Sequence, residues 1–422
     1  MSSTDHGKPP AQLCGERATR IAVAGELKQP DRVPLLLCFM TFLAQTEGIT
    51  RQEMYEDVDK LANATERALR KYEPDAFLAI PQTSAPSKIL GDRMTKWPGH
   101  GLGRDDSFQY VEGEYMKQED YDAFIADPGD WAVRNYWPRV FPSLAGLAML
   151  PHLGTGAFGY YGIDSFLMSI AQPPVAAALE ALSKAAQAEA YWIGKVIEYY
   201  GRMASLGYPP APYATAGLVE APYDFMGDTL RGTQGLFHDM RKVPDKLLAA
   251  EEKVLQLQVD QVIANSKIRN ATSVFIPLHK GSDGFISLAQ FERFYWPQLK
   301  SMMLQFIAAA ITPICFYEGR WDNRLHYLAE LPKGKSIGWF QQSDIFKVKE
   351  IVGDTMCIVG GMPVSKLLCS GPSEIREYTH KLCQEVGKGG GFIMCTDIAD
   401  MEGCNPDLVK VWVGATKEFG KY

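Results

Sequence analysis

The second half of the chain is built from short apolar runs that each end in a polar or reactive cluster. Segments of helix length separate these runs. They are Ser273–Leu278, Thr312–Tyr317, Ser336–Phe340, Met356–Val359 and Gly391–Met394. A parallel strand that is covered on both faces is continuously apolar, and a strand followed by a helix is the βα unit. The pattern therefore predicts a parallel sheet whose strands alternate with helices.

Ligand sites in such folds are built at the carboxyl ends of the strands. Polar or reactive side chains follow or end four of the runs, namely His279, Glu318, Gln341, Asp344 and Cys395. We expect these side chains to meet at one mouth, which is where function should be sought.

Three earlier apolar runs raise the number of predicted strands to eight. They are Val33–Phe39, Ala76–Ile80 and Tyr213–Leu218. Helical spacing predicts the helices Gln52–Lys71, Val175–Gly201, Asp245–Asn265 and Pro406–Phe419. Eight strand–helix pairs favour an α/β fold of the (β/α)8 TIM barrel type. An open sheet is the alternative, because residues 120–210 are difficult to align with the repeat.

One barrel domain is expected over residues 31–422, preceded by a polar lead-in at residues 1–30. Residues 87–140 are rich in Gly, Asp, Tyr and Trp, and the segment Phe108–Gln118 alternates like a hairpin. We therefore expect an insertion after the second strand. No Gly/Ser/Pro linker or block of charge divides the chain, which favours a single domain.

Composition excludes some classes of partner. The formal net charge of −7 leaves no basic surface for nucleic acid. No apolar stretch reaches the roughly 18 residues of a membrane span. The eight cysteines are scattered without a CxxC pair, which is typical of reduced thiols in a cytoplasmic protein.

Several motifs resemble the uroporphyrinogen decarboxylase-like superfamily. They are Tyr223–Gly232, His279–Ser287, Phe291–Pro297, Gly360–Leu368 and Gly387–Ile393. Members of that superfamily are (β/α)8 barrels, which agrees with the strand count. The superfamily includes porphyrinogen decarboxylases and zinc-dependent methyltransferases that exchange methyl groups with a corrinoid protein. The decarboxylases carry an arginine-rich motif after the first strand, but Phe39–Gln45 contains no arginine. The resemblance is therefore to the methyltransferase branch.

The resemblance to that branch implies a zinc site. Its members typically bind zinc through a His-x-Cys pair and a second cysteine after the last strand. The first pair falls on Phe316–Glu318, so glutamate replaces cysteine, and the second cysteine matches Cys395. With His279 supplying a nitrogen, the expected zinc ligands are His279, Glu318 and Cys395, and the expected catalytic residues are Glu318 and His279.

Other interpretations of the same residues stay open. Cys404 or Asp397 could replace one of the three ligands. Glu318 could instead cap a helix or pair with Arg320, Cys395 could be a packed thiol, and His279 could bind a loop or the substrate.

The expected mouth is aromatic, which favours a small organic substrate with an apolar body. The residues expected to bind substrate are Tyr160, Tyr223, Phe225, Phe316, Arg320, Trp339, Gln341 and Asp344.

The expected function is transfer of a methyl group from a small methylated substrate, first of all a methoxylated aromatic, to the cobalt of a separate corrinoid protein. The chain has no corrinoid-binding Asp-x-His-x-x-Gly motif. The corrinoid protein and the substrate are thus the expected partners, and a homodimer is an assembly that this reading allows. The alternatives are a metal-free decarboxylase in which His279 and Arg320 bind a carboxylate, and a barrel that binds a small molecule without catalysis.

Overall fold

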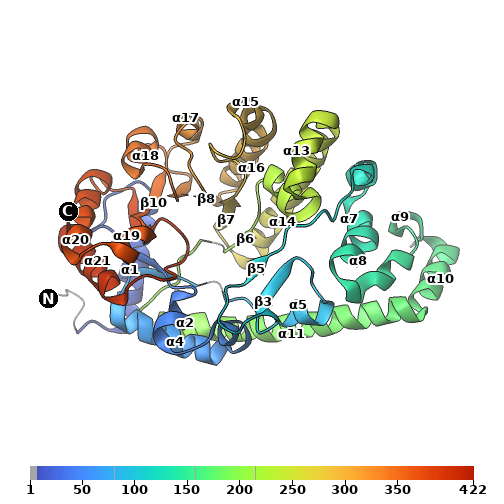
Figure 1. Ribbon diagram of the computed structural model, residues 1–422, viewed down its shortest axis with the longest axis horizontal. Coiled ribbons are helices and arrows are strands. Elements are labelled where there is room, and N and C mark those ends of the chain that lie inside the picture. Colours follow the sequence, from blue (N-terminus) through green and yellow to red (C-terminus); the bar gives the residue numbers. More distant parts are fainter. Residues whose placement is uncertain (1–6, 80, 157, 214) are drawn as a thin grey trace.

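Eight parallel strands lie at the centre of the computed structural model, which describes residues 7–79, 81–156, 158–213 and 215–422 (Figure 1). Within these described residues the strands are β1 (Leu36–Cys38), β2 (Ala76–Leu78), β6 (Gly217–Leu218), β7 (Ser273–Leu278), β8 (Thr312–Tyr317), β9 (Ile337–Phe340), β10 (Cys357–Met362) and β11 (Phe392–Thr396). The predicted strands β7 and β8 have the expected bounds. Ile80 and Ala214, predicted to lie in strands, are outside the described residues.

Backbone pairing closes the strands into a barrel. Strands β6 to β11 form one sheet in sequence order, and β1 pairs with β2. The two sheets meet where Leu35 pairs with Met394, whose N–H donates to the Pro34 carbonyl at 2.8 Å. On the other side, Phe77 pairs with Pro210, in the segment between α11 and β6. The chain is therefore a (β/α)8 TIM barrel, and the open-sheet alternative is wrong.

Helices surround the strands, as the βα repeat requires. After β1 and β2 come α2 (Phe42–Glu47), α4 (Val58–Tyr72) and α11 (Pro173–Ser205), and after β6 come α12 (Pro222–Phe225), α13 (Gly232–Lys242) and α14 (Pro244–Arg269). The remaining strands are followed by α16 (Trp296–Ala308), α17 (Leu325–Leu328), α18 (Ile345–Val352), α19 (Val364–Cys369), α20 (Pro372–Lys381) and α21 (Pro406–Phe419). Figure 1 shows these helices as an arc around the strands.

Alternate strand residues fill the inside of the barrel. This inner cluster includes Leu36, Phe316, Trp339, Val359 and Cys395, and it is separate from the larger core between strands and helices. The segment 1–30, expected to be a polar lead-in, contains helix α1 (Pro10–Gly25), whose Ile21 and Ala24 belong to the inner cluster. The amphipathic α1 thus adds apolar side chains to the inside of the barrel.

The predicted helix Gln52–Lys71 is two helices, α3 (Arg51–Glu56) and α4. Asp57 lies between them with extended backbone, and its carboxylate accepts the N–H of Lys60 at 3.0 Å. An aspartate that caps a helix start competes with continuation of the preceding helix. The periodicity was right on both sides of Asp57, but the break was missed.

The region 87–140 leaves the barrel repeat. It contains β3 (Thr95–Pro98), β4 (Gly101–Leu102) and β5 (Gln109–Tyr110), and β3 and β5 pair antiparallel. It continues into a helical arm with α7 (Pro128–Trp131), α8 (Trp137–Val140), α9 (Leu153–Gly156) and α10 (Gly159–Ile170). The arm extends to one side of the barrel, and α11 runs back from it (Figure 1).

No single helix of the described residues has the length and hydropathy to cross a membrane. Helices α10 and α11 reach those values only as a pair, and they are bent by 81° relative to each other.

A buried ion cluster lies next to the junction of β1 and β2. The fully buried Asp75 carboxylate accepts hydrogen bonds from Arg20 of α1 at 2.5 Å and from two nitrogens of Arg32 at 2.5 and 2.6 Å. It also accepts the N–H of Leu35 at 2.9 Å. Asp75 therefore connects α1, the start of β1 and the start of β2.

We expect Asp75→Asn to lower the free energy of unfolding by about 3–5 kcal/mol, because it leaves buried arginine charge without its partner. The measurement is urea unfolding followed by circular dichroism. The control is Asp31→Asn, since Asp31 also binds Arg20 but its side chain is 65% exposed. That change should cost less than about 1 kcal/mol. Equal losses in the two variants would contradict a special role for Asp75.

A second test concerns Glu251 on α14, which is fully buried and accepts no hydrogen bond from the described residues. Burial, with a smaller contribution from Asp224, raises the pKa of Glu251 well above its usual 4.5. The native state therefore holds this proton more tightly than the unfolded chain. Stability is lost as pH rises above 4.5, by roughly 1.4 kcal/mol per pH unit until the native pKa is reached.

Glu251→Gln removes this ionisable group while keeping its size. We expect the variant to be more stable than the native protein at pH 8, and the difference to vanish as pH falls to about 4. Melting temperatures measured across this range provide the check. A difference that does not change with pH would show that ionisation of Glu251 is not the cause.

Candidate active site at the barrel mouth

Three neighbouring strands end in ionisable residues. Glu220 follows β6, His279 follows β7 and Glu318 follows β8, and these strands pair in that order. Because parallel strands place their carboxyl ends at one edge, the three side chains share one side of the mouth. The predicted proximity of His279 and Glu318 is confirmed, with His279 Nε2 3.5 Å from Glu318 Oε1.

Helix α12 and the π-helical turn that continues it, Met226–Arg231, direct two more carboxylates to the same place. Asp228, within this turn, lies 2.7 Å from His279 Nδ1 and 2.6 Å from Lys280 Nζ. Asp224, four residues earlier, accepts the backbone N–H groups of His279 and Lys280 at 3.1 and 2.8 Å and the Tyr295 hydroxyl at 2.6 Å. Asp224 therefore fixes the backbone after β7, while Asp228 contacts the side chains of His279 and Lys280.

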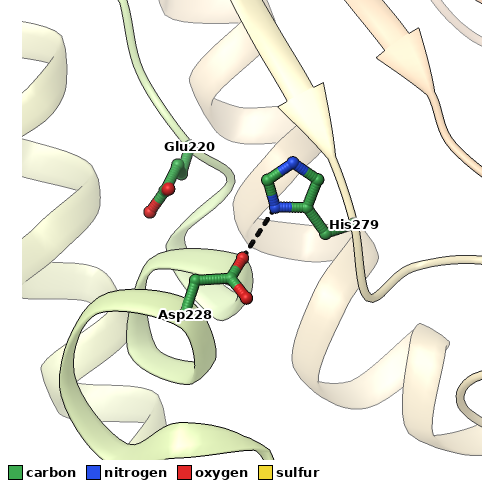
Figure 2. A group of neighbouring side chains, drawn as sticks. All are labelled: Glu220, Asp228 and His279. Atoms are coloured by element: carbon green, nitrogen blue, oxygen red, sulfur yellow. Dashed lines mark hydrogen bonds and ion pairs between the residues drawn. The ribbon is translucent and has the colours of Figure 1, made fainter. Parts of the chain in front are cut away.

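Figure 2 shows Glu220, Asp228 and His279 around a common centre. One ligand atom from each of the three lies within 4.8 Å of the other two. Glu220 comes from the segment after β6, Asp228 from the π-helical turn and His279 from the end of β7. Of the residues that the structure describes, these three are the group of His, Cys, Asp and Glu side chains placed to share a metal ion.

The charged cluster has more acidic groups than basic ones. It consists of Glu220, Asp224, Asp228, His279, Lys280 and Glu318. Burial, together with Asp228 and Asp224, raises the pKa of Glu220 to about 7. Burial also raises the pKa of Asp224 to about 6, although His279 opposes the shift. Burial raises the pKa of Glu318 as well. Among the described residues from the ends of β6 to β8, the carboxyl groups of Glu220, Asp224, Asp228 and Glu318 thus outnumber the cationic groups of His279 and Lys280.

His279 and Asp228 stabilise each other's charge. Burial alone would lower the pKa of His279, but the hydrogen bond to Asp228 and the nearby Asp224 and Glu318 raise it to about 9. Burial alone would raise the pKa of Asp228, but the bonds from His279 and Lys280 lower it. Of the two carboxyl groups beside His279 in Figure 2, Asp228 is therefore kept ionised by its cationic partners, whereas the pKa of Glu220 is raised.

The donor set of this group fits a divalent metal. Two carboxylate oxygens and one imidazole nitrogen are ordinary zinc ligands, and three protein ligands with one open position are typical of catalytic zinc. A dication would also offset the repulsion that raises the pKa of Glu220. The group differs from the expected set of His279, Glu318 and Cys395 in two of three members.

Cys395 lies elsewhere in the barrel. It is fully buried in the inner cluster, 3.7 Å from the sulfur of Cys38 and 3.9 Å from the Thr396 hydroxyl. Of the two residues that were alternatives for one of the three ligands, Cys404 is buried in the outer core, and Asp397 accepts the N–H of Val364 at 2.9 Å.

The predicted substrate residues divide into three groups. Phe316 and Trp339 pack against each other inside the barrel, with ring centroids 5.1 Å apart, and the Trp339 indole donates to the Thr396 carbonyl at the end of β11. These two rings form a buried apolar layer near the ends of the strands.

Gln341 and Asp344 line a cavity of about 110 Å³ at the ends of β9 to β11. Both side chains also have structural partners. Gln341 accepts the N–H of Gly319 at 2.6 Å, and Asp344 caps α18 through the N–H of Phe346. Arg320 is largely exposed, and its guanidinium lies 3.9 Å from Asp322.

The remaining three predicted residues belong to the outer core or to the helical arm. Tyr223 is buried in the outer core, with its ring against Tyr295, and Phe225 is partly buried against the same core. Tyr160 is exposed on α10 in the helical arm.

Glu220, Asp224 and Asp228 were not predicted as site residues. A signal was present, because the three carboxylates recur at intervals of four residues directly after a predicted strand. That spacing places side chains on one face of a helix. The insertion also contributes to the site, since the Tyr110 hydroxyl donates to the Asp228 carbonyl at 2.8 Å and Glu112 lies 3.9 Å from Lys280 Nζ.

Comparison with solved structures agrees with the barrel. A methyltransferase from Methanosarcina mazei is similar to this chain with a TM-score of 0.59 and 15% sequence identity. The match covers 96% of this chain and 98% of the other. At this identity the likeness concerns the fold. No curated protein sequence matches the chain.

Comparison with protein families agrees with the motifs noted in the sequence. The family described as uroporphyrinogen decarboxylase (URO-D) matches residues 169–419, which is more than half of the chain and includes the strands β6 to β11 and every residue of the charged cluster. The chain belongs to the uroporphyrinogen decarboxylase family.

Proposed function

We propose that this protein is a methyltransferase that moves a methyl group from a small methoxylated substrate, first of all an aromatic one, to the cobalt of a separate corrinoid protein. The observation that carries the proposal is the group of Glu220, Asp228 and His279, with Glu318 beside it, at the ends of three neighbouring barrel strands. The sequence likeness to the methyltransferase branch and the solved methyltransferase of similar fold support the same class.

Glu220, Asp228 and His279 would hold the zinc ion. When bound, zinc supplies Lewis acidity that stabilises negative charge on the oxygen that loses the methyl group. A ligand set of oxygen and nitrogen without thiolate leaves the ion hard, and this suits an oxygen leaving group.

The protein's own residues prepare the site in two ways. Lys280 orients Asp228 and Asp224 orients the backbone of His279, so these two of the three ligands need little rearrangement. Glu318, whose pKa is raised by burial and whose side chain is 37% exposed toward the mouth, can give a proton to the departing oxygen. The methyl carbon bonds to reduced cobalt, and the electron pair of the broken C–O bond stays on oxygen.

A decarboxylase is the second candidate, and the protonated His279 favours it. An imidazolium at the mouth, with the exposed Arg320 on the neighbouring loop, can bind a carboxylate. Against it stands the absence of arginine in Phe39–Gln45. Release of carbon dioxide from a carboxylated substrate, without any corrinoid, would move the protein to this class.

Metal content tests the ligand set. We expect about one zinc per chain in the native protein, and zinc near zero in Asp228→Asn and His279→Gln, because two remaining ligands do not hold an open tetrahedral site. Elemental analysis of the purified variants is the measurement. Cys395→Ser is the matched control and should keep its zinc. If Cys395→Ser lost zinc and Asp228→Asn kept it, the set of His279, Glu318 and Cys395 would replace the one proposed.

Kinetics test the role of Glu318. With a series of methoxybenzenes, we expect Glu318→Gln to slow methylation of the corrinoid by roughly 10²–10⁴-fold. The loss should be largest for substrates whose demethylated product is the weakest acid. Corrinoid absorbance follows the reaction. An equal loss across the series would show that Glu318 only supports the structure.

A further inference from the structure

Helix α11 has two apolar stripes, and only one of them faces the protein. The buried stripe includes Val175, Ala178, Ala185, Trp192 and Tyr199. A second stripe repeats every three or four residues from Ala176 to Ile197, and all of its members are exposed. A stripe with this spacing is the seam by which two helices pack together.

The neighbouring helix α10 is apolar and has no buried side chain. Around its start, Phe158, Tyr160 and Tyr161 are 73%, 77% and 86% exposed, and Met168 near its end is 71% exposed. Soluble monomers rarely leave such a contiguous apolar surface to water. Together, α10 and the outer stripe of α11 form the arm face.

We infer that the arm face binds a second copy of this chain, with α11 antiparallel to α11 of that copy and with the two-fold axis between Ser183 and Ala186. In this register the stripe matches itself. Ala176 lies opposite Ile193, Leu179 opposite Ala190, and Ser183 opposite Ala186. An interface with a two-fold axis must be complementary to itself, and this stripe has that property. Small residues at its centre let the two helices approach closely.

The same register gives α10 a role. Residue 173 falls opposite residue 196 of the other helix, so α10, bent by 81° from α11, lies beyond that point. The C-terminal half of α11 packs beside the barrel, because α11 contacts α1 and α4. The aromatic end of one arm would therefore reach the side of the other barrel.

Area and charge favour a second copy over other occupants. Phe158, Tyr160, Tyr161 and Tyr191 are 69–86% exposed, and aromatic side chains bury about 150–250 Å² each. With the aliphatic members of the stripe, the face approaches the roughly 800 Å² per partner of a stable interface. Residues 141–179 contain one acidic residue, Asp164, and no lysine or arginine. An anionic membrane or an acidic partner would gain no charge attraction from them.

The test is the mass of the full-length protein in solution by light scattering at micromolar concentrations. We expect twice the 46.9 kDa of one chain. Ile193→Glu should weaken the association by roughly 100-fold or more, because each copy carries the change into the interface. Ile268→Glu is the control, since Ile268 is 81% exposed on α14 outside the arm face, and it should stay dimeric. All variants should keep the native circular dichroism and melting temperature.

Cross-linking tests the register. In a Cys369→Ser background, which removes the exposed cysteine, a mixture of Ser183→Cys and Ala186→Cys chains should form a covalent dimer on mild oxidation, whereas Ile268→Cys should not. A native protein of single-chain mass would overturn the inference, as would a dimer that survives Ile193→Glu. Binding of the native protein to phosphatidylcholine vesicles that Ile193→Glu abolishes would instead assign the arm face to a membrane.

Discussion

Closure of the parallel sheet is the constraint on which the rest of the structure depends. The joint between β11 and β1 is short, with Leu35 paired to Met394 and one hydrogen bond from Met394 to Pro34. Unpaired strand edges are costly, so a short joint needs support from side chains. Asp75 provides it by binding Arg20, Arg32 and the N–H of Leu35, and helix α1 adds apolar side chains to the barrel interior.

The charged cluster at the mouth depends on that closure. Glu220, His279 and Glu318 are 98 residues apart from first to last in sequence, yet they meet because β6, β7 and β8 are neighbours in the closed barrel. The π-helical turn then adds Asp228, and Asp224 fixes the backbone beneath His279. π-helical turns are frequent at functional sites, because they shift side chains out of the regular helical arrangement.

The electrostatics of the cluster follow from unequal pairing. Asp228 has two cationic partners and keeps its charge. Burial and the nearby Asp228 and Asp224 raise the pKa of Glu220, whose carboxyl group accepts a hydrogen bond from the Thr229 hydroxyl at 3.2 Å. A site that holds one ionised carboxylate beside one partly protonated carboxyl group is ready to accept a cation. Perturbed pKa values of this kind, at the end of barrel strands, are typical of functional sites.

The amino-acid sequence by itself determined the barrel. The bounds of β7, β8 and α21 were predictable, because buried parallel strands are continuously apolar and helices have their own period. The proximity of His279 and Glu318 was also predictable, since the carboxyl ends of neighbouring parallel strands lie at one edge of the sheet. The break at Asp57 was not, because a cap and an exposed helical aspartate look alike in sequence. Tertiary structure alone decided that Glu220 and Asp228 join His279 and that Cys395 lies in the inner cluster. Strand twist and the π-helical turn set where each side chain points, and neither is readable from the period of the sequence.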